Sequence, residues 1–168
     1  MLSNMGMRVI WLARTGWMQS GVPPSIAETV GQHTFLASLI AIDIMGMLKT
    51  KSRTIDEGKA LKMVLIHDLV EGVTGDIPKW SSNRIKKHEL EEEALTSSNV
   101  PDEIMELWRD YEKGESLEAK VARLSDLLAT LKMALYYKEK RFDVESIEES
   151  TRREATRLLN ELDLELET

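Results

Sequence analysis

The chain has 168 residues, a formal net charge of −7 and no cysteine. This length suits one domain with a buried core, and the lack of cysteine excludes disulfides, thiolate zinc sites and cysteine nucleophiles. The acidic balance argues against a duplex nucleic-acid binder. The N-terminus lacks a signal pattern, and the longest apolar stretch, 35–48, is too short to span a membrane and contains Asp43. We therefore expect one domain over residues 1–168, located in the cytoplasm and acting on neither nucleic acid nor membranes.

The first segment, 1–17, begins as a short amphipathic helix and ends in Arg14-Thr15-Gly16-Trp17. Gly16 is predicted to break the helix and to leave Arg14 and Trp17 at a helix-to-loop junction. A surface arginine and an aromatic plug at the core edge would explain the pair. The functional alternative is a phosphate-binding arginine beside an aromatic wall for a base, although the pair taken alone favours the structural explanation.

The next helix is predicted to begin near Ser25, because Ser25 and Glu28 have capping-box spacing, and to run to about Leu48. His33 lies three positions before Leu36 and so faces inward. A histidine there is either a core residue or a ligand. The predicted inward stripe consists of Val30, Phe35, Leu36, Leu39, Ile40, Ile44, Met47 and Leu48.

A third helix is predicted from a cap at 54–57 to the adjacent pair His67-Asp68, which closes an apolar run. Leu61, Val64, Leu65 and Asp68 recur at helical spacing. A carboxylate at the end of a buried helix must be paired, protonated or metal-bound, because burying it alone is too costly. Glu71 and Asp76 follow within ten positions, so this stretch is rich in groups that bind metal or move protons.

Two helices of different character come next. The first is a charged helix whose polar residues indicate a solvated face, and His88 within it is left out of the site. These residues are Lys86, Lys87, Glu89, Glu91, Glu92 and Glu93. The second begins at 101–103 and is predicted to turn Ile104, Leu107, Trp108 and Tyr111 inward.

A long helix is predicted from 114–116 to about Lys140, with apolar residues on two sides. Asp126 is the charged member of the second stripe, in which all other members are small or apolar. Its partner is either a basic residue or a metal. A charged helix over 144–166 is expected to pack across the others. With no strand-like alternation, the fold class is predicted to be all-α.

Four inward polar residues thus lie on three helices: His33, His67, Asp68 and Asp126. Two imidazoles and two carboxylates projecting into one core indicate a mixed nitrogen and oxygen metal site more readily than four separate accidents. Such ligands suit Co, Mn, Ni, Fe, Zn or Mg.

The pattern resembles the HD-domain superfamily of metal-dependent phosphohydrolases. The flanking residues resemble those of its YfbR-like 5′-deoxynucleotidase branch over about residues 8–140, with a C-terminal packing helix at about 144–166. The matching segments, in the order of that branch, are Arg14-Thr15-Gly16-Trp17, Glu28-Thr29-Val30-Gly31-Gln32-His33, His67-Asp68-Leu69-Val70-Glu71, Gly75-Asp76-Ile77 and Ser125-Asp126.

The resemblance implies one divalent cation, a homodimer and hydrolysis of nucleoside 5′-monophosphates, with 2′-deoxy forms expected, to nucleoside and phosphate. It implies that Glu71 and Asp76 are the catalytic acidic pair, and that Arg14 and Trp17 bind the phosphate and the nucleoside. The implied metal ligands are His33, His67, Asp68 and Asp126. Gln32 departs from the pattern, because related sequences often carry an acid before the first histidine, and glutamine cannot act as a base.

Two other functions fit the same framework. One is an HD-type phosphodiesterase or nucleoside triphosphate hydrolase, although the chain has no additional inward histidine pair of the kind that a two-metal member needs. The other is a non-catalytic, metal-stabilised binding or dimerisation module. Glu71 and Asp76 disfavour the module, since a purely structural metal site does not need them.

Overall fold

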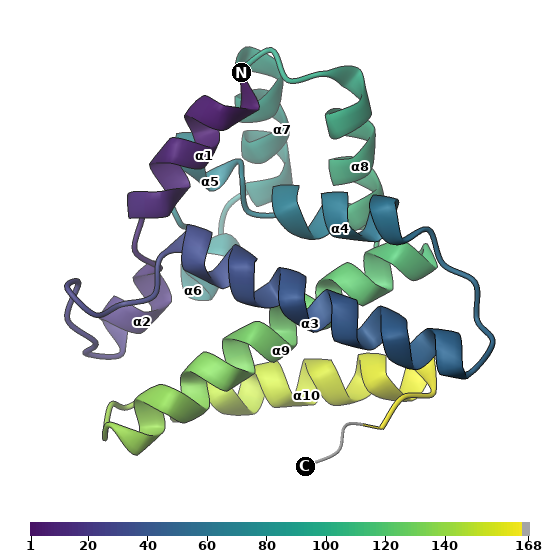
Figure 1. The fold of residues 1–168 in the computed structure, drawn as a ribbon. Coiled ribbons are helices and arrows are strands. Elements are labelled where there is room, and N and C mark those ends of the chain that lie inside the picture. The colour runs from purple at the N-terminus through teal and green to yellow at the C-terminus, as the bar shows by residue number, and fades with distance from the viewer. Residues whose placement is uncertain (166–168) are drawn as a thin grey trace.

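The computed structural model describes residues 1–165, and within them the regular elements are α-helices joined by short loops (Figure 1). One isolated β-bridge joins Ala13 and Thr29. The predicted all-α class is confirmed. The helices are α1 (Leu2–Trp11), α2 (Thr15–Gln19), α3 (Val30–Thr50), α4 (Glu57–Ile66), α5 (Glu71–Thr74), α6 (Lys79–Ser82), α7 (Lys87–Ser97), α8 (Asp102–Lys113), α9 (Leu117–Glu139) and α10 (Glu145–Leu162).

The core is built around α9, which packs against α3, α4, α8 and α10. In Figure 1, α3 crosses α9 while α10 runs beside it. Ala37 and Ala41 of α3, and Ala122 and Ala129 of α9, are buried almost completely. Small side chains let packed helices approach closely, which explains the stripe of small residues in the sequence of α9. The polar residues of that stripe and of α3 are thereby brought close together.

Helix α3 begins at Val30 rather than near Ser25. Thr29 is its cap: the Thr29 hydroxyl accepts from the Gln32 amide at 3.2 Å, and the Gln32 side chain accepts from the Thr29 amide at 2.9 Å. The preceding residues are held extended, because Arg14 N–H donates to the Glu28 carbonyl and Val30 N–H donates to the Leu12 carbonyl. Glu28 is therefore not a capping residue, and Gln32 has a structural use as half of a capping box.

The same pairing ends α1. Helix α1 stops at Trp11, and Gly16 lies inside the short helix α2, so the prediction that Gly16 breaks the first helix was wrong. Residues 12–14 leave the helical conformation because their backbone groups bond to residues 28–30 instead. Arg14 sits just before α2, at the point where the two extended segments meet.

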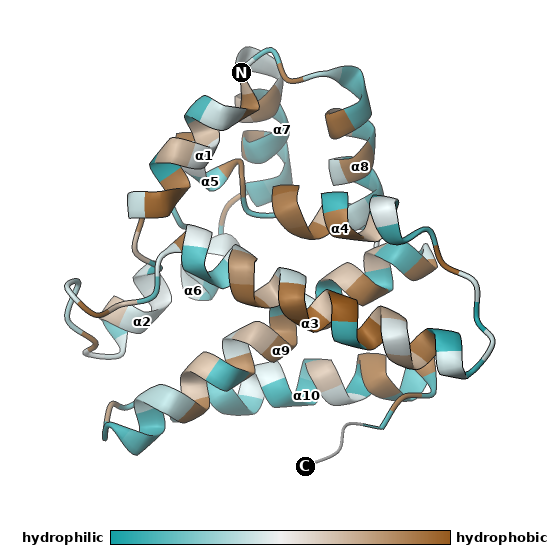
Figure 2. Ribbon diagram, viewed as in Figure 1, coloured by the Kyte–Doolittle hydropathy of each residue, from teal (hydrophilic) through white to brown (hydrophobic). Residues whose placement is uncertain are grey.

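Apolar residues are spread around helix α3 and are not confined to the predicted inward stripe. By length and composition it could cross a membrane, although eight of its residues, including His33, are buried inside the fold. Phe35 and Leu39, predicted to face inward, are exposed, as is Leu65 of α4. Figure 2 shows apolar residues along α3 and α9, with α10 more hydrophilic. Apolar residues occur on both sides of α3, so periodicity did not identify the buried one.

Helix α10 packs along α9 (Figure 1), whereas the charged tail was predicted to pack across the other helices. It ends at Leu162, where Asp163 adopts a left-handed conformation that stops the helix. The helix was predicted to continue to Leu166, but residues 163–165 are not helical, and Leu166 lies outside the described residues.

Candidate active site

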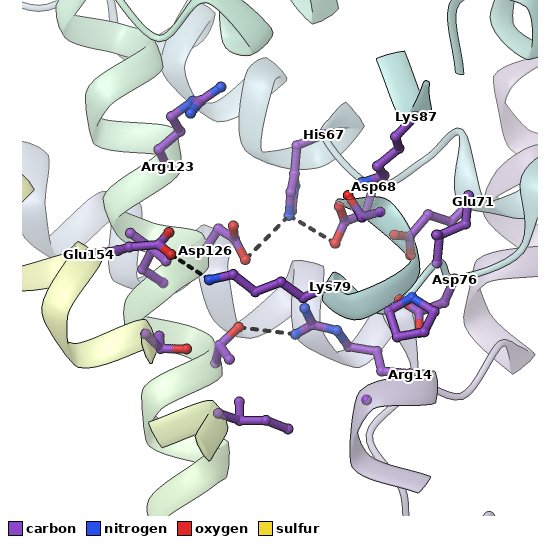
Figure 3. Close-up of a pocket in the computed structure, with 18 of the residues that line it drawn as sticks. Arg14, His67, Asp68, Glu71, Asp76, Lys79, Lys87, Arg123, Asp126 and Glu154 are labelled. Atoms are coloured by element: carbon purple, nitrogen blue, oxygen red, sulfur yellow. Dashed lines mark hydrogen bonds and ion pairs between the residues drawn. The ribbon is translucent and has the colours of Figure 1, made fainter. Parts of the chain in front are cut away.

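Three helices bring the four predicted ligands together. His33 lies in the first turn of α3, His67 and Asp68 follow the end of α4, and Asp126 lies midway along α9. His33 Nε2 is 3.0 Å from Asp126 Oδ1, and His67 Nε2 is 3.1 Å from Asp68 Oδ2. The cross distances, His33 to Asp68 and His67 to Asp126, are both 4.0 Å. In Figure 3, His67, Asp68 and Asp126 point toward one another.

The donor set fits a divalent cation. One nitrogen or oxygen atom from each of His33, His67 and Asp68 lies within 4.8 Å of the others. His67 Nδ1 donates to the Val64 carbonyl at 2.7 Å, which leaves Nε2 as the nitrogen that faces the carboxylates. His67 Nε2 is buried and has no hydrogen-bond partner. A cation between the imidazoles and carboxylates would satisfy that atom.

The charges within the cluster are strongly coupled. Burial lowers the pKa of His67, but the neighbouring Asp68 carboxylate raises it by more, to about 9. Burial raises the pKa of Asp68, whereas His67, His33 and Arg14 lower it further, so that its pKa lies well below the usual range. A metal ligand must be neutral imidazole, so cation binding displaces a proton from His67.

Glu71 and Asp76 differ in environment. Glu71 lies on α5 and is buried, and its Oε2 has no hydrogen-bond partner. Burial, with the charges of Asp68 and Asp76, raises the pKa of Glu71 to about 10, so Glu71 is protonated at neutral pH. Asp76 instead accepts from the Thr15 backbone amide, and the Thr15 hydroxyl donates to the Asp76 carbonyl at 3.1 Å. Asp76 therefore fastens the start of α2 to the loop after α5.

Arg14 joins the cluster to a buried acid. Its Nη1 lies 2.7 Å from His33 Nδ1, 3.2 Å from the Thr130 hydroxyl and 3.6 Å from Glu28 Oε2. Burial lowers the pKa of Arg14, but the carboxylates of Asp68, Glu28 and Asp126 raise it further, so its pKa lies above the usual value. The guanidinium is a permanent cation at the pocket wall (Figure 3).

Trp17 is more enclosed than its predicted role suggests. It is only 2% exposed, its Nε1 donates to Glu28 Oε2 at 3.0 Å, and its ring lies 5.1 Å from that of Tyr137. It still contributes to the pocket wall. Contact with a base stays a prediction for this residue.

These groups surround one pocket of about 610 Å³. Seven of the eight predicted site residues line it, and His33 lies beneath it, fully buried. Lys79 of α6 pairs with Glu154 of α10 at 2.5 Å, and both residues line the pocket (Figure 3). Pocket residues that the sequence did not identify include Lys79, Lys87, Tyr111, Arg123, Thr130 and Glu154.

Lys87 and Glu91 correct the prediction that the charged helix has only a solvated face. Glu91 is buried and pairs with Lys87 at 3.1 Å, and both line the pocket. The missed signal was helical spacing: positions 87 and 91 share a face with the buried Ala94 and Leu95. His88 instead stacks on Trp108, with ring centroids 4.9 Å apart.

The chain and its fold have counterparts among known proteins. A family model described as HD domain matches residues 11–163. The chain belongs to the HD-domain family. This HD-domain protein is 30% identical to 5′-deoxynucleotidase HDDC2 of Dictyostelium discoideum over 144 residues, covering 80% of this chain and 75% of that protein. It is 32% identical to 5′-deoxynucleotidase HDDC2 of Danio rerio, covering 75% of this chain but only 62% of that protein.

Solved structures agree with the fold of the HD-domain protein. A conserved hypothetical protein from Pyrococcus furiosus has a TM-score of 0.85 and 29% sequence identity, covering 96% of this chain and 94% of that one. A protein from Pyrococcus horikoshii has a TM-score of 0.83 and 27% identity, covering 97% and 96%. The helical arrangement described above is therefore also seen in these proteins along nearly their whole length.

Proposed function

We propose that this protein is a metal-dependent phosphomonoester hydrolase that converts nucleoside 5′-monophosphates, preferably 2′-deoxy forms, to nucleoside and phosphate. One observation carries the proposal: the ligand cluster, the Arg14 guanidinium and the buried Glu71 meet at a single pocket. The relatives named 5′-deoxynucleotidases support the choice of substrate.

A phosphate monoester is difficult to hydrolyse because its negative charge repels a nucleophile and its leaving group is poor. A bound divalent cation supplies Lewis acidity, which lowers the pKa of water and neutralises charge on phosphoryl oxygens. His33, His67, Asp68 and Asp126 would hold one such cation. Its identity among Co, Mn, Ni, Fe, Zn and Mg is left to experiment.

The chain's own residues divide the remaining work. Arg14 presents a planar fork of N–H donors that can bind two phosphate oxygens. Glu71 holds a proton at neutral pH and can give it to the leaving 5′-oxygen as the phosphorus–oxygen bond breaks. Asp76 keeps α2, and with it the Arg14 segment, in place through Thr15. We therefore assign proton donation to Glu71 and a positioning part to Asp76 within the acidic pair.

The pocket has the size of a small-molecule site, which typically measures roughly 300–1,000 Å³. Trp17, Pro78 and Ile147 supply apolar side chains to its wall. That surface suits the nucleoside half of the substrate, while the cationic Arg14 suits the phosphate.

The test is phosphate release from a panel of ribo- and deoxyribonucleoside monophosphates, after chelation and with Co²⁺, Mn²⁺, Mg²⁺ or no metal restored. Cation-dependent release with faster turnover of deoxy substrates is expected. Product analysis on diesters and triphosphates runs in parallel. A nucleotide or triphosphate product, with no release from any monophosphate, would contradict the proposal and favour the diesterase or triphosphatase alternative.

The remaining proposals concern the whole protein. We propose one domain over residues 1–168, a cytoplasmic location, no nucleic-acid or membrane partner, and a homodimer. The HD-domain match over residues 11–163 supports the single domain. An exposed apolar face of α3 supports self-association; we define it by Phe35, Leu39 and Ile42, which are exposed and share one side of the helix by their spacing.

A further inference from the structure

The two histidines of the cluster differ in what fixes their protons. His67 Nδ1 faces the Val64 carbonyl at 2.7 Å, an acceptor only, so this imidazole carries a proton on Nδ1, and Nε2 is the nitrogen that can ligate a cation. His33 Nδ1 faces Arg14 Nη1 at 2.7 Å. Arginine has no acceptor, so His33 Nδ1 must accept and the proton of this imidazole lies on Nε2, which donates to Asp126 Oδ1 at 3.0 Å.

A proton on Nε2 prevents His33 from acting as a metal ligand through that nitrogen. A ligand must present the Nε2 lone pair to the cation, so the proton must leave Nε2 and one must be gained at Nδ1. The proton that leaves Nε2 and the proton gained at Nδ1 balance, so the number of protons on the ring does not change. Arg14 cannot remain at hydrogen-bond distance from a protonated Nδ1, because both groups would then be donors.

Glu28 is the acceptor available for that proton. Its Oε2 lies 3.8 Å from His33 Nδ1 and 3.6 Å from Arg14 Nη1. The Glu28 side chain is buried, Trp17 Nε1 donates to the same oxygen at 3.0 Å, and Tyr137 accepts from the Glu28 backbone amide at 2.8 Å. The carboxylate is thus held beside both groups and shielded from water.

We propose that Glu28 is a positioning residue that accepts the Nδ1 proton of His33 when the cation binds, which fixes His33 as a ligand and releases Arg14 toward the pocket. This inference rests on the proposed function only in assuming that the cluster binds a divalent cation. Arg14 then keeps the Thr130 hydroxyl, 3.2 Å away, as a neighbour and turns its fork to the phosphate. The Glu28 side chain thus couples cation binding to the release of Arg14 for the phosphate of the substrate.

Zn²⁺ is a suitable probe because it is diamagnetic and binds imidazole and carboxylate. Long-range ¹H–¹⁵N spectra of the wild-type imidazoles report which ring nitrogen carries the proton, with chelator and with Zn²⁺. We expect the His33 proton on Nε2 with chelator and on Nδ1 with Zn²⁺, while the His67 proton stays on Nδ1 once its Nε2 is ligated. A His33 Nδ1 that still lacks a proton in the Zn²⁺-loaded protein would overturn the proposal, and this measurement needs no substitution.

Affinity gives the second readout. Zn²⁺ binding is measured by competition with a chelator for wild type, Glu28→Gln and the matched control Glu148→Gln. Glu148 is also buried but pairs with Lys138 at 2.6 Å and Arg152 at 3.0 Å, and it does not line the pocket. Glu28→Gln should weaken binding by about tenfold to hundredfold, the usual effect of losing a partner of a ligating histidine. Glu148→Gln should leave binding unchanged.

Equal Zn²⁺ affinity in Glu28→Gln and wild type would contradict the proposal, as would a wild-type protein that binds no cation at the cluster. A wild-type protein that binds Zn²⁺ with the proton moved to Nδ1, yet releases no phosphate with any cation, would leave this inference standing and overturn the proposed function.

Discussion

Glu71 is the residue at which stability and catalysis conflict most directly. Its pKa is raised from an ordinary 4.5 to about 10 by burial and by the charges of Asp68 and Asp76. The folded state therefore binds a proton that the unfolded state releases between these two values. The stability due to this group is fully present below pH 4.5 and is lost as the pH rises toward 10.

Replacing Glu71 with glutamine should therefore stabilise the protein at alkaline pH and disable it. In chelator at pH 9, we expect the free energy of unfolding to rise by about 1–3 kcal/mol, because glutamine cannot ionise in the buried site. At pH 5 the difference should largely vanish. Phosphate release should fall by roughly 10²–10⁴-fold, the usual contribution of a positioned acid.

Denaturant unfolding at the two pH values and a phosphate assay check both effects. A Glu71→Gln protein that keeps wild-type turnover would remove the proton-donor role. A pH-independent stability difference would show that Glu71 is ionised in the folded wild type.

Arg14 should not be replaceable by lysine. Lysine keeps the charge but loses the planar fork that can contact two phosphate oxygens. We expect kcat/KM for a nucleoside monophosphate to fall by about 10–100-fold in Arg14→Lys, corresponding to about 1.4–2.7 kcal/mol of transition-state stabilisation. Steady-state kinetics measure this, and equal kcat/KM in the two proteins would show that Arg14 serves only as a point charge.

At the scale of the elements, the N-terminal cap of α3 positions a residue of the site. His33 lies in the first turn, directly after the capping pair of Thr29 and Gln32. Thr29→Ala removes the hydroxyl acceptor and should cost about 1 kcal/mol, or roughly 2–4 °C in Tm for a domain of this size. Thr156→Ala is the matched control, since that exposed hydroxyl donates to the Arg152 carbonyl within α10 and caps nothing. Equal melting temperatures in the two variants would contradict the capping role.

The start of α3 also shows where sequence reasoning fails. Ser25 with Glu28, and Thr29 with Gln32, have the same capping spacing. Only the pairing of residues 12–14 with 28–30 selects the second. Local patterns predicted α4, α7, α8, α9 and α10 closely, because each carries its own cap or charge signals. The short helices α2, α5 and α6 have too few residues to show a period.

The ligand cluster was predictable for a different reason. His33 and Asp126 interrupt stripes of small and apolar residues, and that conflict is visible in the sequence alone. Thr130 and Lys79 interrupt nothing, so their place at the pocket emerges only when α6 and α9 are assembled. Glu28 belongs to one of the matching sequence segments. Its burial against Trp17, however, depends on contacts that no spacing rule describes.

For the whole molecule, the exposed apolar face of α3, formed by Phe35, Leu39 and Ile42, predicts self-association. Burying such a face between two copies is favourable, because apolar area leaves water. Sedimentation equilibrium should give a dimer for wild type and a monomer for Phe35→Asp. Leu135→Asp, on an exposed part of α9 outside this face, should remain dimeric. A monomeric wild type would contradict the proposed homodimer.

The central claim is that one bound cation makes this pocket hydrolytic. The most direct measurement is a titration of the chelated protein with Co²⁺, in which phosphate release from a deoxynucleoside monophosphate is followed beside bound metal per chain. We predict release that rises from near zero and saturates at one cation per chain, with neither signal in Asp68→Ala. Release that is independent of cation, or a protein that binds one cation and releases no phosphate, would contradict the account.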